Sequence, residues 1–198
     1  MASKQLKNVF LSASIPLPER DAKYFETADI VAIRDCIIAL TTVVLPKYKL
    51  IWGGHPSITP LIYYVMNRID LNIQNHVQLY QSIWFKDIFP QGNNEFENIV
   101  YTEKLQDKSA SVNLMRQQML SENEYSAAIF IGGMDGIEEE FVMFRDKYPD
   151  ILVLPIASTG AATKIIYDTL LPDIFKNERL LKDYGYMSLL QDLLIDKI

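Results

Sequence analysis

Glycine residues give the strongest indication of chemistry here, because six of the eight follow short apolar runs and precede helical patterns. At such positions glycine lets the backbone adopt positive φ and approach a ligand closely. The helix that follows offers unpaired N–H groups and a partial positive charge, which suit a phosphate. The alternative is that each glycine only makes a tight turn between strand and helix. Because three such sites are expected at one sheet edge, we favour a ligand crevice; the glycines are Gly53, Gly54, Gly132, Gly133, Gly136 and Gly160.

The second glycine site is followed closely by three carboxylates. Gly132-Gly133-Met134-Asp135-Gly136 is followed, after one isoleucine, by Glu138, Glu139 and Glu140. Carboxylates in a first helical turn stabilise the helix dipole, and they also repel a phosphate at the same terminus. A carboxylate that faces the crevice suits a ribose hydroxyl, as an acceptor or a general base. The sequence contains neither Gly-x-Gly-x-x-Gly nor a P-loop motif, which excludes those two phosphate-binding classes.

Several polar side chains near the expected strand ends are further candidates. Arg116 could pair with a phosphate through its planar guanidinium, although an arginine on such a helix is usually solvated. His55 is equally compatible with a phosphate donor and with an ordinary loop residue. Thr159 is compatible both with an anion donor and with a helix N-cap. With the glycines, the predicted ligand-binding residues are Ser12, Ser14, Arg20, His55, Gln81, Arg116, Met134 and Thr159.

Composition limits the class of protein. The chain has 19 basic and 25 acidic residues, a net charge of −6 and no basic block, which argues against nucleic acid as a partner. Its single cysteine, Cys36, cannot form an internal disulfide, and its two histidines lack zinc-ligand spacing. We therefore predict no metal site and no cofactor. We also expect no membrane partner and a cytoplasmic location, because the sequence shows neither a signal peptide nor a spanning segment.

Strand and helix patterns alternate along the whole chain, so the crevice residues fall at strand ends. Apolar strands that alternate with helices indicate an α/β fold, namely a doubly wound, mostly parallel Rossmann-like sheet with helices on both faces. We predict one domain over residues 1–198, with an irregular segment at 84–97 as the candidate lid. The predicted strands are 9–13, 49–52, 77–83, 99–102, 127–131 and 151–156. The predicted helices are 29–45, 57–69, 109–123, one that residues 132–136 open and that runs to about 148, one opened by Thr159, 170–182 and 186–195.

The combination of motifs resembles the SLOG superfamily, which includes the phosphoribohydrolases called Lonely Guy. The resemblance rests on Ile51-Trp52-Gly53-Gly54, on Arg116, and on the Gly-Gly-x-x-Gly-x-x-Glu-Glu pattern that begins at Gly132. The opening residues 10–14, the 53–60 loop and the 158–162 turn are closer to the SLOG sensor domains found beside TIR and Sir2 effectors in bacterial anti-phage systems. That branch binds nucleotide-derived signals such as cyclic ADP-ribose isomers.

The resemblance implies one of two functions. The first is the binding or sensing of a nucleotide-derived ligand such as ADP-ribose or a cyclic isomer, in a dimer or tetramer that acts through its own assembly or on an effector protein. The second is hydrolysis of a nucleoside 5′-monophosphate, with Arg116 and either Glu139 or Glu140 as catalytic residues. Ile131 and Ile137 replace a proline and a threonine of the enzyme pattern, and Asp135 is an extra residue. These departures weaken the expectation of hydrolysis and leave nucleotide binding intact. A third, weaker possibility is a nucleoside deoxyribosyltransferase, which would need a carboxylate nucleophile.

Overall fold

One parallel sheet organises the chain. The computed structural model describes residues 6–69, 74–90 and 92–198. Six parallel strands pair in the order β4-β3-β2-β1-β5-β6, which confirms the predicted α/β class. The order reverses between β1 and β5, and ligands of doubly wound sheets bind at such a switch point. The strands are β1 (Asn8–Ser14), β2 (Lys49–Gly53), β3 (Val77–Ser82), β4 (Ile99–Thr102), β5 (Tyr125–Gly132) and β6 (Leu152–Ile156).

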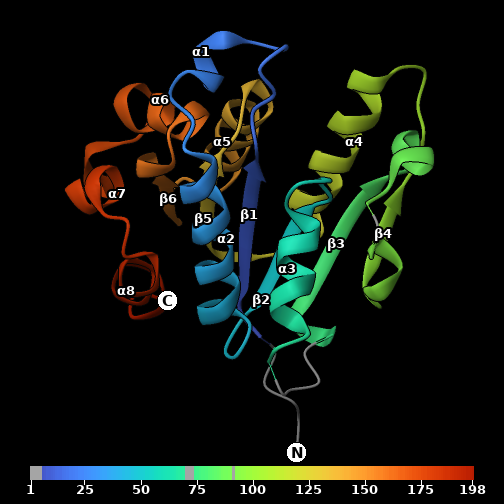
Figure 1. The fold of residues 1–198 in the computed structure, drawn as a ribbon. Helices are drawn as coiled ribbons and strands as arrows, with labels where there is room; N and C mark the ends of the chain where they lie inside the picture. Colours follow the sequence, from blue (N-terminus) through green and yellow to red (C-terminus); the bar gives the residue numbers. More distant parts are fainter. Residues whose placement is uncertain (1–5, 70–73, 91) are drawn as a thin grey trace, which may run out of the picture.

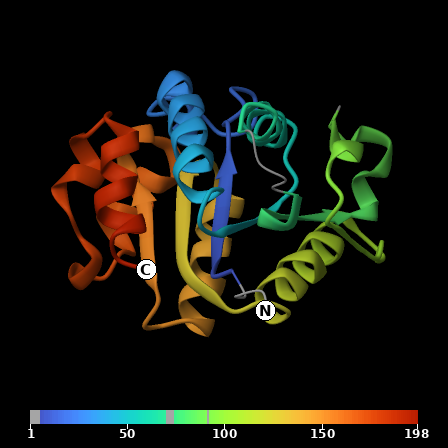
Figure 2. The ribbon, with the colours of Figure 1, turned by 90° about the horizontal axis from the view of Figure 1, so that it is seen from below.

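Helices cover both faces of the sheet, as the sequence predicts (Figures 1 and 2). Side chains alternate along each strand, so Val9 and Leu11 of β1 join one hydrophobic core while Phe10 joins the other. The first core is closed by α2 (Ile30–Val44), α3 (Thr59–Met66) and α8 (Tyr186–Leu190). The second core is closed by α4 (Lys108–Ser121), α5 (Asp135–Lys147) and α6 (Ala161–Thr169). Within the described residues, each helix is too short or too polar to cross a membrane.

The prediction of a helix over 170–182 was wrong for its first part. Helix α6 ends at Thr169, a 3₁₀ turn spans Asp173–Phe175, and only α7 (Glu178–Lys182) is α-helical. Pro172 has no N–H to donate within a continuing helix. The side chain of Asn177 accepts the N–H of Arg179 and starts α7 anew. The pattern at 186–195 is divided between α8 and a π-helix, Gln191–Ile195.

Other loops also contain short helices. The segment between β1 and α2 includes α1 (Ala22–Phe25), which begins where Asp21 accepts the N–H of Lys23. The segment predicted to be irregular contains the 3₁₀ helices η2 (Ile83–Ile88) and η3 (Asn93–Glu95), and its residue 91 lies outside the described residues. Two further 3₁₀ turns are η1 (Gln74–His76) and η4 (Ala157–Thr159).

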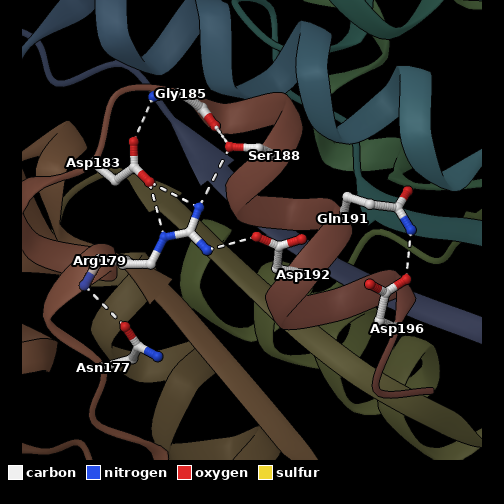
Figure 3. A network of polar contacts seen from close by, with 8 residues as sticks. All are labelled: Asn177, Arg179, Asp183, Gly185, Ser188, Gln191, Asp192 and Asp196. Atoms are coloured by element: carbon white, nitrogen blue, oxygen red, sulfur yellow. Dashed lines mark hydrogen bonds and ion pairs between the residues drawn. The ribbon is translucent and has the colours of Figure 1, made fainter.

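Arg179 ties the C-terminal segment together (Figure 3). Its guanidinium donates to Asp183 at 3.0 Å and to Asp192 at 2.8 Å, which joins α7 to the π-helix. In the same segment, the hydroxyl of Tyr186 lies 3.2 Å from that of Ser158 in η4. The C-terminal helices therefore brace the turn that follows β6.

Candidate functional site

The switch point lies between the carboxyl ends of β1 and β5, where Ser14 pairs with Gly132. The chain leaves β5 through Gly132 and Gly133, whose φ angles are +60° and +83°. A side chain is strained at such angles. At Gly133 a Cβ atom would also lie 2.0 Å from Cγ1 of Ile137. These two glycines are therefore required by the turn that starts α5.

The N–H groups of this turn are bonded within the protein. Gly133 donates to the carbonyl oxygen of Ser14 at 2.8 Å, and Gly132 donates to the hydroxyl of Thr159 at 2.9 Å. The amides of Gly54 and Gly160 likewise donate to backbone carbonyls. Tight turns therefore account for these four amides, which are not free to donate to a ligand.

Thr159 acts as a structural link in this arrangement. The residue is fully buried, and its hydroxyl donates to the carbonyl of Ile156 at 2.6 Å while it accepts from Gly132. The following Gly160 has φ of +73°, and a Cβ there would lie 1.8 Å from the carbonyl oxygen of Thr27. The first two N–H groups of α6 are also occupied: Ala161 donates to the Thr27 hydroxyl and Ala162 to a carbonyl of the β5 turn.

The N-terminus of α5 differs, because it is open. Met134 precedes the helix as a buried residue and supplies no side-chain hydrogen bond to it. The N–H groups of Asp135 and Gly136 have no acceptor among the described residues. Ser14 ends β1 beside them, and its hydroxyl has no side-chain partner in the part of the chain that the structure describes. Free N–H groups at a helix N-terminus suit an anion, so this end of the helix can receive one.

Arg116 of α4 reaches across to α5 and is not solvated there. Its side chain is 11% exposed, its Nε donates to Glu140 at 3.0 Å, and its Nη1 donates to Glu139. Its Nη2 donates to the carbonyl of Gly136 at 3.2 Å, which fixes the guanidinium against the first turn of α5. Burial lowers the pKa of Arg116, but the two carboxylates raise it more, so the net direction is upward. The guanidinium is charged and firmly placed.

The two glutamates have different environments. Glu140 is 15% exposed, and its second oxygen accepts the hydroxyl of Ser12 at 2.6 Å. Both oxygens of Glu140 are therefore engaged, by Arg116 and by β1. Glu139 is 61% exposed and contacts Arg116 through one oxygen, which leaves its second oxygen toward solvent. Glu140 is thus a buried anchor between Arg116 and β1, whereas Glu139 is largely exposed to solvent.

His55 and Arg20 lie in the loops that follow β2 and β1, close enough for the charge of Arg20 to act on the His55 ring. The ring Nδ1 of His55 accepts the N–H of Ser57 at 3.2 Å, so the proton of the neutral ring is on Nε2. Burial, together with the positive charge of Arg20, lowers the pKa of His55 to about 4, and the ring is a neutral donor at pH 7. Arg20 itself is half exposed and lies 3.4 Å from Asp135 at the start of α5. It brings a cation to the open helix end.

The Gly53–Gly54 loop has close packing on both sides. A Cβ at Gly53 would lie 3.0 Å from Cε of Met115, and one at Gly54 would lie 2.4 Å from the amide of Gln81. Gln81 is buried and donates to Oδ1 of Asn93 at 2.9 Å. The loop is therefore close to Arg116 through the neighbouring Met115, while Gln81 is held in a buried contact with Asn93.

The chain matches a known family over most of its length. The model of the SLOG cluster3 family matches residues 23–194. The chain belongs to the SLOG cluster3 family. No curated protein matches it. Membership in this SLOG family fits a nucleotide-related ligand-binding role or a role similar to that of the Lonely Guy enzymes.

In this SLOG chain, the structure brings together many of the predicted residues and separates others. Ser12, Arg116, Gly136, Glu139 and Glu140 form one bonded group. Arg20 pairs with Asp135 at the start of the same helix, and Ser14 pairs with Gly132 in the sheet. Thr159, Gly160 and Gln81 are buried in supporting contacts.

Three contacts near the site were not predicted from the sequence. Tyr24 and Lys23 contact Glu138, and Thr27 accepts from the start of α6. The capping aspartate Asp21 is the one local pattern that could have indicated the helix carrying Lys23 and Tyr24.

Proposed function

We propose that this protein binds a nucleotide-derived ligand of the ADP-ribose class at the open end of α5. The observation that carries the proposal is the pair of unbonded amides, Asp135 and Gly136, at the switch point of the sheet. A phosphate there accepts from these two N–H groups. Ser14 and the Nε2 proton of His55 supply further donors, and Arg20 supplies the charge.

The carboxylates near the site are compatible with an anionic ligand, because those of Glu139 and Glu140 are paired with a buried cation and that of Asp135 is largely exposed to water, which screens its charge. Glu140 and Glu139 pair with Arg116, and Asp135 pairs with Arg20. The free oxygen of Glu139 can accept a ribose hydroxyl at the mouth of the site. The phosphate contacts at α5 and the ribose contact at Glu139 need no bond cleavage. Binding and sensing is therefore the function that we favour.

Calorimetry with ADP-ribose, cyclic ADP-ribose isomers, AMP and NAD tests this proposal, with adenosine as the uncharged control. We expect at least one phosphate-bearing ligand to bind and adenosine to bind far more weakly. Arg20→Gln should weaken binding about tenfold, because hydrogen bonds to a charged group contribute about 1.5–3 kcal/mol. Arg34→Gln is the matched control, since Arg34 forms an equally exposed pair with Asp35. If none of the four ligands binds, the proposal fails.

Hydrolysis of a nucleoside 5′-monophosphate is the second candidate, and Glu139 favours it. A partly free carboxylate beside a buried Arg116 can stabilise positive charge at a ribose carbon while the arginine holds the leaving group or the phosphate. Incubation with AMP and chromatography for free adenine tests this function. Adenine release that Glu139→Gln abolishes would establish hydrolysis and displace simple sensing.

We also propose how ligand binding is signalled: it changes either the interaction with a protein partner or the self-assembly of this chain. The resemblance to sensor domains beside TIR and Sir2 effectors supports an effector in anti-phage signalling. Sedimentation of the chain with and without ADP-ribose tests the assembly route, for which we expect a dimer or tetramer. An identical monomer in both states would exclude it.

A further inference from the structure

The segment that links β1 to α2 crosses the open end of α5 (Figure 1). We propose that residues 17–25, here called the strap, form a lid that a ligand holds closed and that Glu138 latches. The contacts that close the strap are seen in the structure, whereas its response to a ligand rests on the proposed function.

The end of the strap nearest α2 is latched to α5 by a carboxylate. The hydroxyl of Tyr24 donates to Glu138 at 2.7 Å, and Nζ of Lys23 lies 4.0 Å from the same carboxylate. Tyr24 is 3% exposed, and its ring belongs to the core between the sheet and α5. A short hydrogen bond to a charged, partly buried acceptor is among the stronger polar contacts in a protein. Glu138 therefore determines how firmly the strap is closed.

The two ends of the strap are held differently. Just beyond it, Thr27 accepts the N–H of Ala161, and the N–H of Asp29 donates to the carbonyl of Thr159 at 3.1 Å. Toward β1 the tip is exposed, including Leu17, and its side-chain contact with α5 is the pair of Arg20 and Asp135. The strap thus has a fixed base and a weakly held tip.

Arg20 can pair either with the Asp135 carboxylate or with the phosphate of a ligand. Its Nη2 lies 3.4 Å from Oδ1 of Asp135, and both side chains are about half exposed. Water strongly screens the attraction between such exposed charges. A phosphate on the amides of Asp135 and Gly136 would lie beside the same guanidinium and would compete for it. Because only the closed strap brings Arg20 there, an anionic ligand binds the closed form more tightly and increases its population.

Trypsin tests the latch without a ligand, because Lys23 lies within the strap. Cleavage after Lys23, followed by mass spectrometry, reports how often the strap opens. We expect Glu138→Gln and Tyr24→Phe each to increase this cleavage about tenfold, equivalent to about 1.4 kcal/mol of opening free energy. Glu178→Gln removes an exposed carboxylate from a distant pair with Lys182 and should leave the rate unchanged. A cleavage rate that neither Glu138→Gln nor Tyr24→Phe changes would overturn the latch.

Ligand dependence is tested with ADP-ribose in the same assay. At about 100 times its dissociation constant, ADP-ribose should slow cleavage after Lys23 by up to about 100-fold in the wild-type chain. Protection that is equal at Lys23 and at Lys182 would overturn the strap as a ligand-responsive lid. If calorimetry shows no binding while Glu138→Gln still increases cleavage, the latch stands and the proposed function is the part that fails.

Discussion

Arg116 should be coupled strongly to Glu140 and weakly to Glu139, although it contacts both. The side chains of Arg116 and Glu140 are 11% and 15% exposed, whereas that of Glu139 is 61% exposed. Two unit charges about 4 Å apart interact by about 4 kcal/mol at an effective dielectric constant of about 20. Desolvation cancels part of this energy, so we expect a coupling of about 2 kcal/mol for Arg116 with Glu140. For Glu139 we expect less than about 1 kcal/mol.

Double-mutant cycles measure both couplings. Urea unfolding gives the free energy of the wild type, Arg116→Ala, Glu140→Gln, Glu139→Gln and the two double variants. Raising the salt from about 0.1 M to about 1 M shortens the Debye length from about 10 Å to about 3 Å. The Glu139 coupling should then fall toward zero, while that of Glu140 should persist because both partners are shielded from water.

Equal couplings at the two glutamates would refute this reasoning, since the difference in exposure would then have no energetic consequence. A Glu140 coupling below about 0.5 kcal/mol would also refute it, because the buried pair would contribute no more than an exposed one. In either case Glu140 could not be described as the anchor of the site.

Three further predictions follow from single residues. The pKa of His55 is lowered to about 4, so between about pH 6.5 and 4 its ring binds fewer protons in the folded protein than in the unfolded chain. His55 alone should therefore lower the free energy of unfolding by about 3 kcal/mol over that range, and His55→Gln should remove this contribution. An unchanged slope in His55→Gln would show that other groups cause it. Gly160→Ala should destabilise by more than about 3 kcal/mol, because its Cβ would meet the carbonyl of Thr27, whereas Gly185→Ala should cost about 1 kcal/mol or less. Thermal unfolding of the two variants checks this, and similar melting temperatures would contradict it. Ser14→Ala should weaken ADP-ribose binding in calorimetry without changing stability by more than about 1 kcal/mol, and unchanged affinity would remove Ser14 from the site.

Much of the architecture could be predicted because it depends on local patterns. Apolar β-rich runs indicated the strands, and residues 30–44 were correctly expected to be helical despite Thr41 and Thr42. The hydroxyls of these threonines donate to the carbonyls of Ile37 and Ile38, one turn earlier, which satisfies them within the helix. The stretch between Thr169 and Glu178, which is not α-helical, was missed because apolar spacing continued across Pro172.

The detailed geometry of the site could not be predicted, because its contacts join residues far apart in sequence. Glycine positions indicated turns correctly, but the use of the Gly132 amide by Thr159 depends on the packing of α6 against β5. Similarly, Ser12 contacts Glu140 only because β1 lies beside α5. The sequence could not show which of Glu139 and Glu140 is buried. In the fold Glu140 is 15% exposed and Glu139 is 61% exposed, which distinguishes them.

Chemical-shift mapping by NMR, with ADP-ribose added to the labelled protein, tests the central claim most directly. We predict saturable shifts that are largest at the amides of Asp135 and Gly136 and at Ser14, with little change on adding adenosine. Shifts confined to the groove of about 490 Å³ between the start of β6 and the C-terminus, which Ile174 and Lys197 help to line, would contradict the account. So would the absence of any saturable shift with ADP-ribose.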